Sequence, residues 1–166
     1  TFYESLNNVI KRFRQTPISD IGVSSITLSE LEYGVMKSAK PEQNRLALAQ
    51  FIAPIDIFAY DDVAAQHYGE IRAHLEKQGT PIGSLDMLIS AHALSIDSVL
   101  ITNNESEFKR VSNLKIENWV KRHLSLLENT QHLGFLNRLP AFADVELPVN
   151  VMNGDLTVAV ETYSLS

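Results

Sequence analysis

Side chains that could hold a divalent cation stand at three separate places in this chain, each close to a predicted strand end or helix start. They are Glu30, Asp86, Asn103 and Asn104. Carboxylate and amide oxygens are hard ligands of the kind that Mg²⁺ and Mn²⁺ prefer. A cation held in this way can activate water and neutralise the charge that develops on a phosphodiester. These residue types therefore point to metal-assisted phosphodiester hydrolysis.

Each of these residues also has an ordinary structural interpretation. Asp86 stands at the start of a predicted helix, where an acid complements the helix dipole. Glu30 has the spacing of a capping box with Thr27. Asn103 and Asn104 are residues that turns commonly use. The residue types alone therefore leave the catalytic and the structural interpretations open.

Strands and helices alternate in the part of the chain that must position these side chains. Helical periodicity predicts helices over 2–15, 27–38, 41–53 and 62–78. Pro41 is expected at the first position of the third helix, Asp61 or Asp62 at the start of the fourth and Gly79 at its end. A fifth helix is expected to begin after an N-cap at Ser84. Short apolar runs predict strands at 21–26, 55–60, 98–102 and 114–119. This alternation is typical of a parallel sheet with helices on its faces. Because parallel strands end on the same edge, we expect the candidate side chains to converge there.

Composition and charge narrow the classes of protein. The chain has 166 residues and no cysteine, which excludes disulfides, thiolate metal sites and cysteine nucleophiles. Its net charge of −6 argues against a protein that coats nucleic acid through bulk positive charge, but it allows a local site. The histidines show no convincing zinc spacing, and His92 lies in an apolar helical pattern that predicts a core position. No run approaches the length of a membrane span, so we expect a cytoplasmic protein.

The character of the chain changes after Trp119. Residues 146–152 and 156–163 alternate apolar and polar side chains around Asn153-Gly154. An Asn-Gly pair between two such runs is a strong hairpin signal, because it supplies the positive φ angles of a type I′ turn. We therefore predict a C-terminal extension over 121–166 that ends in a β-hairpin.

Three segments resemble the PIN-domain ribonuclease toxins of the VapBC toxin–antitoxin systems. They are VSSITLSELEYGVMKS, KQGTPIGSLDMLISAHA and VLITNNESEFKRVSNLKIENW, in the order and spacing of that family. The resemblance covers roughly residues 8–120 and implies a PIN-like nuclease domain over 1–120. It further implies an Mg²⁺-dependent endoribonuclease toxin that acts on RNA such as tRNA, usually dimerises and is inhibited by a cognate antitoxin protein.

The resemblance also assigns roles to the candidate residues. Glu30 matches the acidic metal-site glutamate of the family, and Asp86 matches its central catalytic aspartate, so both are expected to hold Mg²⁺ or Mn²⁺. Asn103 or Asn104 stands where many relatives have a further acid, and these amides are expected to orient water or phosphate.

The sequence departs from the family pattern at the N-terminal end. The family opens with a strand that ends in Leu-Asp-Thr-Asn, whose aspartate is the first metal ligand, and no such segment precedes the helix over 2–15. The faint echo of it is Ala159-Val160-Glu161-Thr162, and the tail hairpin could fill the vacant place in the sheet. The alternative function is therefore a catalytically impaired binding module that keeps antitoxin or dimer contacts without cleavage.

Overall fold

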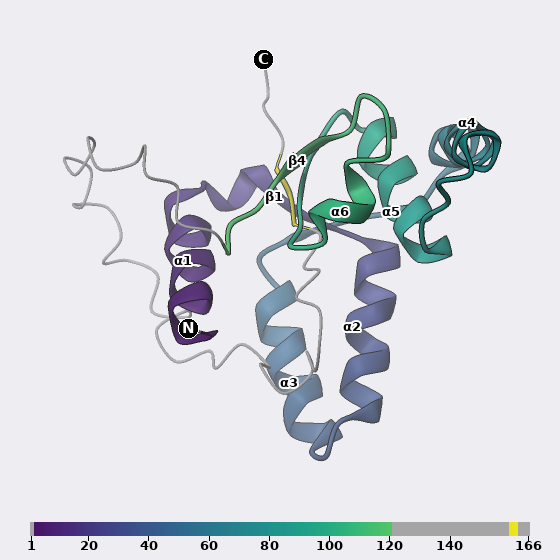
Figure 1. Ribbon diagram of the computed structural model, residues 1–166. Coiled ribbons are helices and arrows are strands. Elements are labelled where there is room, and N and C mark those ends of the chain that lie inside the picture. The colour runs from purple at the N-terminus through teal and green to yellow at the C-terminus, as the bar shows by residue number, and fades with distance from the viewer. Residues whose placement is uncertain (1, 121–159, 163–166) are drawn as a thin grey trace, which may run out of the picture.

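The computed structural model describes residues 2–120 and 160–162, which form a mixed sheet with helices on both faces (Figure 1). The sheet has the strand order β2-β1-β5-β3-β4. Its strands are β1 (Ile21–Ser24), β2 (Asp56–Phe58), β3 (Val99–Ile101), β4 (Lys115–Glu117) and β5 (Val160–Thr162). The helices are α1 (Phe2–Gln15), α2 (Ser25–Lys37), α3 (Pro41–Ile52), α4 (Asp62–Gln78), α5 (Ser84–Ser95) and α6 (Glu105–Phe108), with a 3-10 turn η1 (Ile18–Asp20) before β1.

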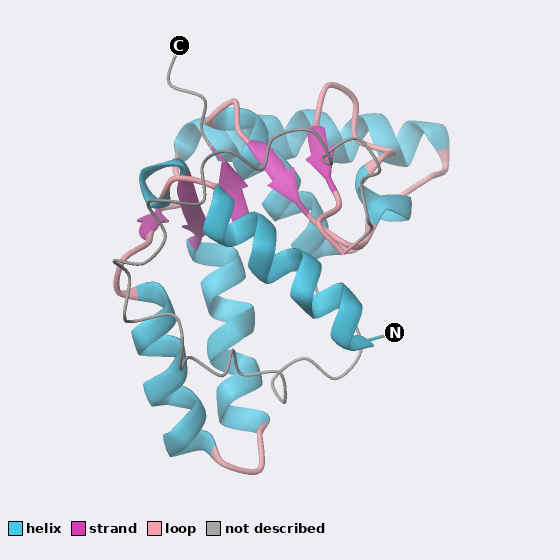
Figure 2. Ribbon diagram, turned by 90° about the vertical axis from the view of Figure 1, so that its left-hand side faces the viewer, coloured by secondary structure: helices cyan, strands magenta, loops and turns pink. Residues whose placement is uncertain are grey.

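Two layers of helices cover the sheet. Ile101 packs in a cluster with α1, α2 and α3, whereas its neighbour Leu100 packs in another cluster with α5 and Phe108. Successive residues of a strand point to opposite faces, so this split shows that the sheet is buried on both sides. In Figure 1, α1 stands on one side of the sheet and α4 and α5 on the other. Figure 2 shows α1 lying across the face that is turned to the viewer, and a pair of helices, α2 and α3 in Figure 1, extending beyond the sheet.

The predicted helices and strands are largely confirmed, and their ends follow local chemistry. Asp61 caps α4, because its Oδ1 accepts a hydrogen bond of 2.9 Å from the backbone N–H of Ala64. Gly79 ends the same helix with a φ of +69°, a left-handed conformation that glycine adopts without strain. Pro41 occupies the first position of α3 as predicted.

Two predicted helix caps are wrong. The N-cap of α2 is Ser24, whose hydroxyl accepts from the N–H of Ile26, so the predicted strand ends earlier and Thr27 lies inside the first turn. Thr27 is then too far into the helix to form a capping box with Glu30, which lies in the second turn. The N-cap of α5 is Gly83 rather than Ser84, and it provides no side-chain hydrogen bond.

The sheet is not parallel throughout. β1 and β2 pair in parallel, as do β3 and β4, but β5 runs antiparallel to both β1 and β3. The other predicted strand of the C-terminal hairpin lies outside the described residues. Among the described residues, no helix is long and apolar enough to span a membrane.

Candidate functional site

Asp86 and Asn104 meet where β3 ends and α5 begins. Asp86 lies in the first turn of α5 and is half-buried. Asn104 follows β3, and its Nδ2 donates a hydrogen bond of 3.3 Å to Oδ2 of Asp86. The buried Thr102 fixes the backbone of Asn104, because the backbone N–H of Asn104 donates to Oγ1 of Thr102 at 3.0 Å. The prediction that the strand-end amides meet the acid of α5 therefore holds for Asn104.

Gly83 lies against the same carboxylate. A Cβ atom at this position would be 3.4 Å from Oδ2 of Asp86 and 3.8 Å from its Cγ. These are ordinary van der Waals distances, so a larger residue would fit but would cover part of the carboxylate. The glycine thus adds no side-chain atom on this side of Asp86.

Asn103 lies in a different polar network. Its side chain is exposed, and its Oδ1 accepts a hydrogen bond of 3.2 Å from Nδ2 of Asn118. The same Nδ2 donates to Oε1 of Glu105 at 2.7 Å, and Glu105 forms an ion pair with Lys109. Asn103 therefore helps to order the loop between β3 and α6 rather than contacting Asp86. The sequence carried no clear signal for Asn118, which lies beyond the end of β4.

Glu30 approaches from the other half of the sheet. It is exposed on α2, the helix that follows β1, whereas Asp86 and Asn104 belong to α5 and the loop after β3. The structure shows the predicted contact between Asp86 and Asn104. The convergence of Glu30 with this pair stays a prediction.

The donors at this edge have the chemistry that Mg²⁺ or Mn²⁺ requires. Asp86 and Asn104 offer carboxylate and amide oxygens. Among the described residues, no group of three acids or histidines lies close enough together to hold an ion. One carboxylate and one amide suit a largely hydrated cation, because Mg²⁺ is commonly bound through one or two carboxylates and keeps several waters.

Behind the site, a buried hydrogen bond joins β1 to α5. The Oγ of Ser24 lies 2.7 Å from Nδ1 of His92, and both side chains are buried. The ring of Tyr60 meets His92 edge-on, with centroids 5.8 Å apart. Burial lowers the pKa of His92, and the negative charge of Asp61 opposes part of that shift. The predicted core position of His92 is confirmed, but its partner Ser24 had no signal in the sequence.

Tyr60 is also tied to the start of α2. Its backbone N–H donates to Oγ of Ser25, and its hydroxyl donates to the backbone oxygen of Ala64. Burial raises the pKa of Tyr60, with smaller contributions from Tyr68 and Asp61. The Tyr60 phenol is therefore protonated at neutral pH and acts as a structural donor.

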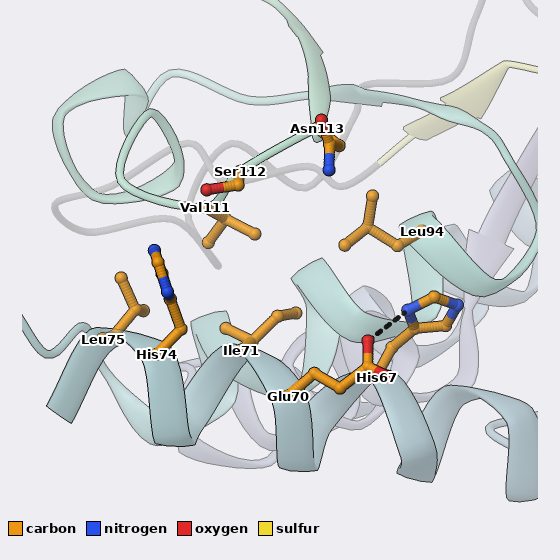
Figure 3. A pocket seen from close by; sticks show the side chains of 9 residues that line it. All are labelled: His67, Glu70, Ile71, His74, Leu75, Leu94, Val111, Ser112 and Asn113. Atoms are coloured by element: carbon orange, nitrogen blue, oxygen red, sulfur yellow. Dashed lines mark ion pairs between the residues drawn. The ribbon is translucent and has the colours of Figure 1, made fainter. Parts of the chain in front are cut away.

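A separate cleft lies between α4 and the segment before β4 (Figure 3). Its floor is apolar, and its rim carries His67, Glu70 and His74. Nδ1 of His67 lies 3.7 Å from Oε2 of Glu70, and the two form an ion pair when the histidine is protonated. The lining contains neither Asp86 nor Asn104. The cleft is therefore distinct from the acidic site at the sheet edge.

Comparison with known proteins identifies the family. Residues 3–114 match the family model of the PIN domain. The chain is 41% identical to ribonuclease VapC2 of Rickettsia felis over 121 residues, which are 73% of this chain and 86% of the relative. It is 46% identical to the tRNA(fMet)-specific endonuclease VapC of Shigella flexneri over 97 residues, which are 58% of this chain and 74% of that protein.

A solved structure supports the same assignment. The DNA-bound VapBC complex from Salmonella typhimurium contains a chain that superposes with a TM-score of 0.65 at 43% sequence identity, covering 68% of this chain and 84% of that chain. The chain belongs to the PIN-domain family. Within that family it is a ribonuclease toxin of the VapC type, as the sequence motifs predicted.

Proposed function

We propose that this VapC-type chain is an Mg²⁺-dependent endoribonuclease that cleaves tRNA-like substrates at the edge formed by Asp86 and Asn104. The hydrogen bond from Asn104 Nδ2 to Asp86 Oδ2 is the observation that supports this most directly. It joins a helix-start acid and a strand-end amide at the edge where α/β proteins bind ligands. The related Shigella enzyme acts on tRNA(fMet), which makes a folded tRNA the first substrate to test.

Asp86 and Glu30 would hold the cation, and Asn104, the strand-end amide that contacts Asp86, would orient water or a phosphate oxygen. A bound Mg²⁺ supplies an activated water and neutralises charge on the phosphodiester. Asn104 orients the Asp86 carboxylate through its amide, and the N-terminus of α5 favours negative charge at that position. Gly83 adds no side-chain atom on its side of the carboxylate.

The proposed organisation is a nuclease domain over 1–120 followed by an extension over 121–166. The family match over residues 3–114 supports the first boundary. The Salmonella relative was solved as a VapBC complex bound to DNA, so we propose a cognate antitoxin as the protein partner of this chain. We also propose a homodimer and a cytoplasmic location, where RNA and antitoxin are both available.

The function is tested by incubating the purified chain with tRNA and Mg²⁺, beside Asp86→Asn, Glu30→Gln and an EDTA control. Asp97→Asn is the matched control, because Asp97 is an exposed acid with a φ of +49° that asparagine tolerates equally well. We expect cleavage by the unmodified chain and by Asp97→Asn, and loss of cleavage in the other three samples. Calorimetric titration with Mn²⁺ should show weaker binding to Asp86→Asn than to Asp97→Asn.

Two results would contradict the proposal. Cleavage that survives Asp86→Asn or EDTA would exclude the metal site described here. Absence of cleavage by the unmodified chain, with antitoxin binding retained, would favour the impaired binding module instead.

A further inference from the structure

The central strand of the sheet is supplied by the far end of the chain. β5 lies between β1 and β3 and pairs antiparallel with both, whereas the outer pairs are parallel (β5 is yellow in Figure 1). Glu161 lies opposite Gly22 on one side and Leu100 on the other. Val160 lies in the same way between Val23 and Ile101. Each residue of β5 is thus in register with both neighbouring strands.

The other strands form two pairs that β5 alone joins into one sheet. Without it, β2-β1 and β3-β4 would each end at a strand that lies inside the molecule. With β5 in place, Ile21 of β1 is 1% and Leu100 of β3 is 0% exposed. Buried backbone N–H and C=O groups need partners, and no other strand of the described chain is placed to supply them. The gap between β1 and β3 therefore requires a strand.

The position of β5 in the sequence separates its docking from the formation of the other elements. Among the described residues, the four other strands and the six α-helices lie within residues 2–117, and β5 begins only at residue 160. Extended chain spans about 3.3 Å per residue, so the connection over 121–159 is long enough to bring β5 to this gap from any direction.

We propose that the gap between β1 and β3 is a strand-acceptor site whose ligand is the chain's own segment 160–162, docked antiparallel and in cis. Recognition consists of backbone pairing, as in the addition of a peptide strand to a sheet edge. Here the segment pairs with two edges, those of β1 and β3. The site accepts an extended segment, and its selectivity comes from the register with Gly22 and Leu100.

The docked strand also sets the distance between the two halves of the candidate site. β1 leads into α2, which carries Glu30, whereas β3 leads into the loop that carries Asn104. Asp86 and Asn104 lie together in the second half, so their contact does not depend on β5. The proposal rests on the sheet alone and stands or falls independently of the proposed nuclease function.

Disulfide trapping tests the register and the origin of the strand. The chain has no cysteine, so a designed pair is free of competing thiols. Val23 and Val160 are direct partners across β1 and β5, and the pair Val23→Cys with Val160→Cys should form an intramolecular disulfide on mild oxidation. Ile21→Cys with Val160→Cys is the matched control, because the partner of Ile21 is Thr162 and the mismatch of two residues separates the Cα atoms too far for a disulfide.

Non-reducing electrophoresis and mass spectrometry of the peptides give the result. A monomeric disulfide in the Val23 pair alone supports the proposal. It is overturned if the Val23 pair forms no disulfide, if both pairs react equally, or if the bond links two chains, since the last result would mean that β5 comes from a second copy.

A proline in β5 tests whether the strand protects its neighbours. Glu161→Pro removes a backbone donor from the centre of the sheet, and Glu161→Thr is the control because threonine favours strands. We expect the amides of β1 and β3 to exchange with solvent faster by about tenfold or more in Glu161→Pro only, with α4 unchanged. Unchanged protection of β1 and β3 in Glu161→Pro would overturn the proposal.

Discussion

Ser24 Oγ and His92 Nδ1 lie 2.7 Å apart in the interior, although 68 positions separate the two residues in the sequence. Ser24 ends β1 and caps α2, and His92 lies in the last turn of α5. The same hydroxyl accepts from the N–H of Ile26, so one oxygen serves both a helix cap and a tertiary contact. This contact joins the half of the domain that carries Glu30 to the half that carries Asp86.

Removal of that hydroxyl should destabilise the domain measurably. Ser24→Ala removes the cap of α2 and leaves the buried Nδ1 of His92 without its partner. We expect the free energy of unfolding in urea to fall by about 1–3 kcal/mol. Ser29→Ala, an exposed serine on the same helix, should change it by less than about 0.5 kcal/mol. Equal effects of the two substitutions would show that the Ser24 contact adds nothing.

The stability of the domain should depend on the protonation of His92. Burial lowers the pKa of His92 in the folded state below its ordinary value of 6.5, so the unfolded chain takes up the proton first as the pH falls. The stabilisation is therefore complete above about pH 6.5 and declines below it, by up to about 1.4 kcal/mol per pH unit, until the folded pKa is passed. Unfolding in urea between pH 7.5 and pH 5 measures this slope.

Two variants identify the source of the slope. His92→Asn should flatten it relative to the unmodified chain. Asp61→Asn should extend the decline to lower pH, because the charge that opposes the lowering of the His92 pKa is gone while the helix cap is retained. A slope that is identical in the unmodified chain and in His92→Asn would assign it to other groups.

The two adjacent asparagines should differ in their effect on RNA cleavage. Asn104→Ala removes the amide that donates to Asp86, and residues that orient a metal-binding carboxylate typically contribute about 10- to 100-fold to activity or metal affinity. Asn103→Ala removes only the contact with Asn118 on the loop. We therefore expect a loss of this size in initial cleavage rate and Mn²⁺ affinity for Asn104→Ala, and little change for Asn103→Ala. Equal losses would contradict the assignment.

Two glycines of the α4 region should respond to alanine with opposite signs. Gly79 has a φ of +69°, so Gly79→Ala strains the helix end and should lower the free energy of unfolding by about 1 kcal/mol. Gly69 lies inside α4, and Gly69→Ala should raise it by about 0.5–1 kcal/mol. Nothing lies within 4 Å of an added Cβ at either position, so crowding does not confuse the comparison. Thermal and urea unfolding measure both values.

Local signals in the sequence predicted most of the elements correctly. Of the two acids predicted as the cap of α4, Asp61 takes the position, and the proline at the start of α3 and the glycine at the end of α4 are confirmed. Each of these signals acts on the backbone within one helical turn. The caps at Thr27 and Ser84 were wrong, since a neighbouring residue, Ser24 or Gly83, takes the position instead. Patterns of capping residues locate a helix start only to within a few residues.

The candidate site, too, was predicted correctly in some features and not in others. Residue types and family motifs pointed to Asp86, and the alternation of strands and helices predicted that a strand-end amide would reach it. Which of the two asparagines does so depends on the loop after β3, where Thr102 holds Asn104 toward Asp86 and Asn118 holds Asn103 away. These hydrogen bonds join residues whose spacing in the sequence has no regular period. They therefore could not be predicted from a sequence pattern.

Side-chain types and contacts within one helical turn were enough to predict the family and most of the helices, and they indicated Asp86 and Glu30 as candidate metal ligands. The strand that occupies the centre of the sheet, in contrast, could be identified only in the folded chain. The Val160-Glu161-Thr162 segment was a faint echo in the sequence, yet it lies antiparallel between β1 and β3. Backbone pairing requires only an extended segment in register, so a side-chain pattern does not identify the strand that pairs. The distant segment that fills the buried gap depends on the space between the two parts of the folded domain.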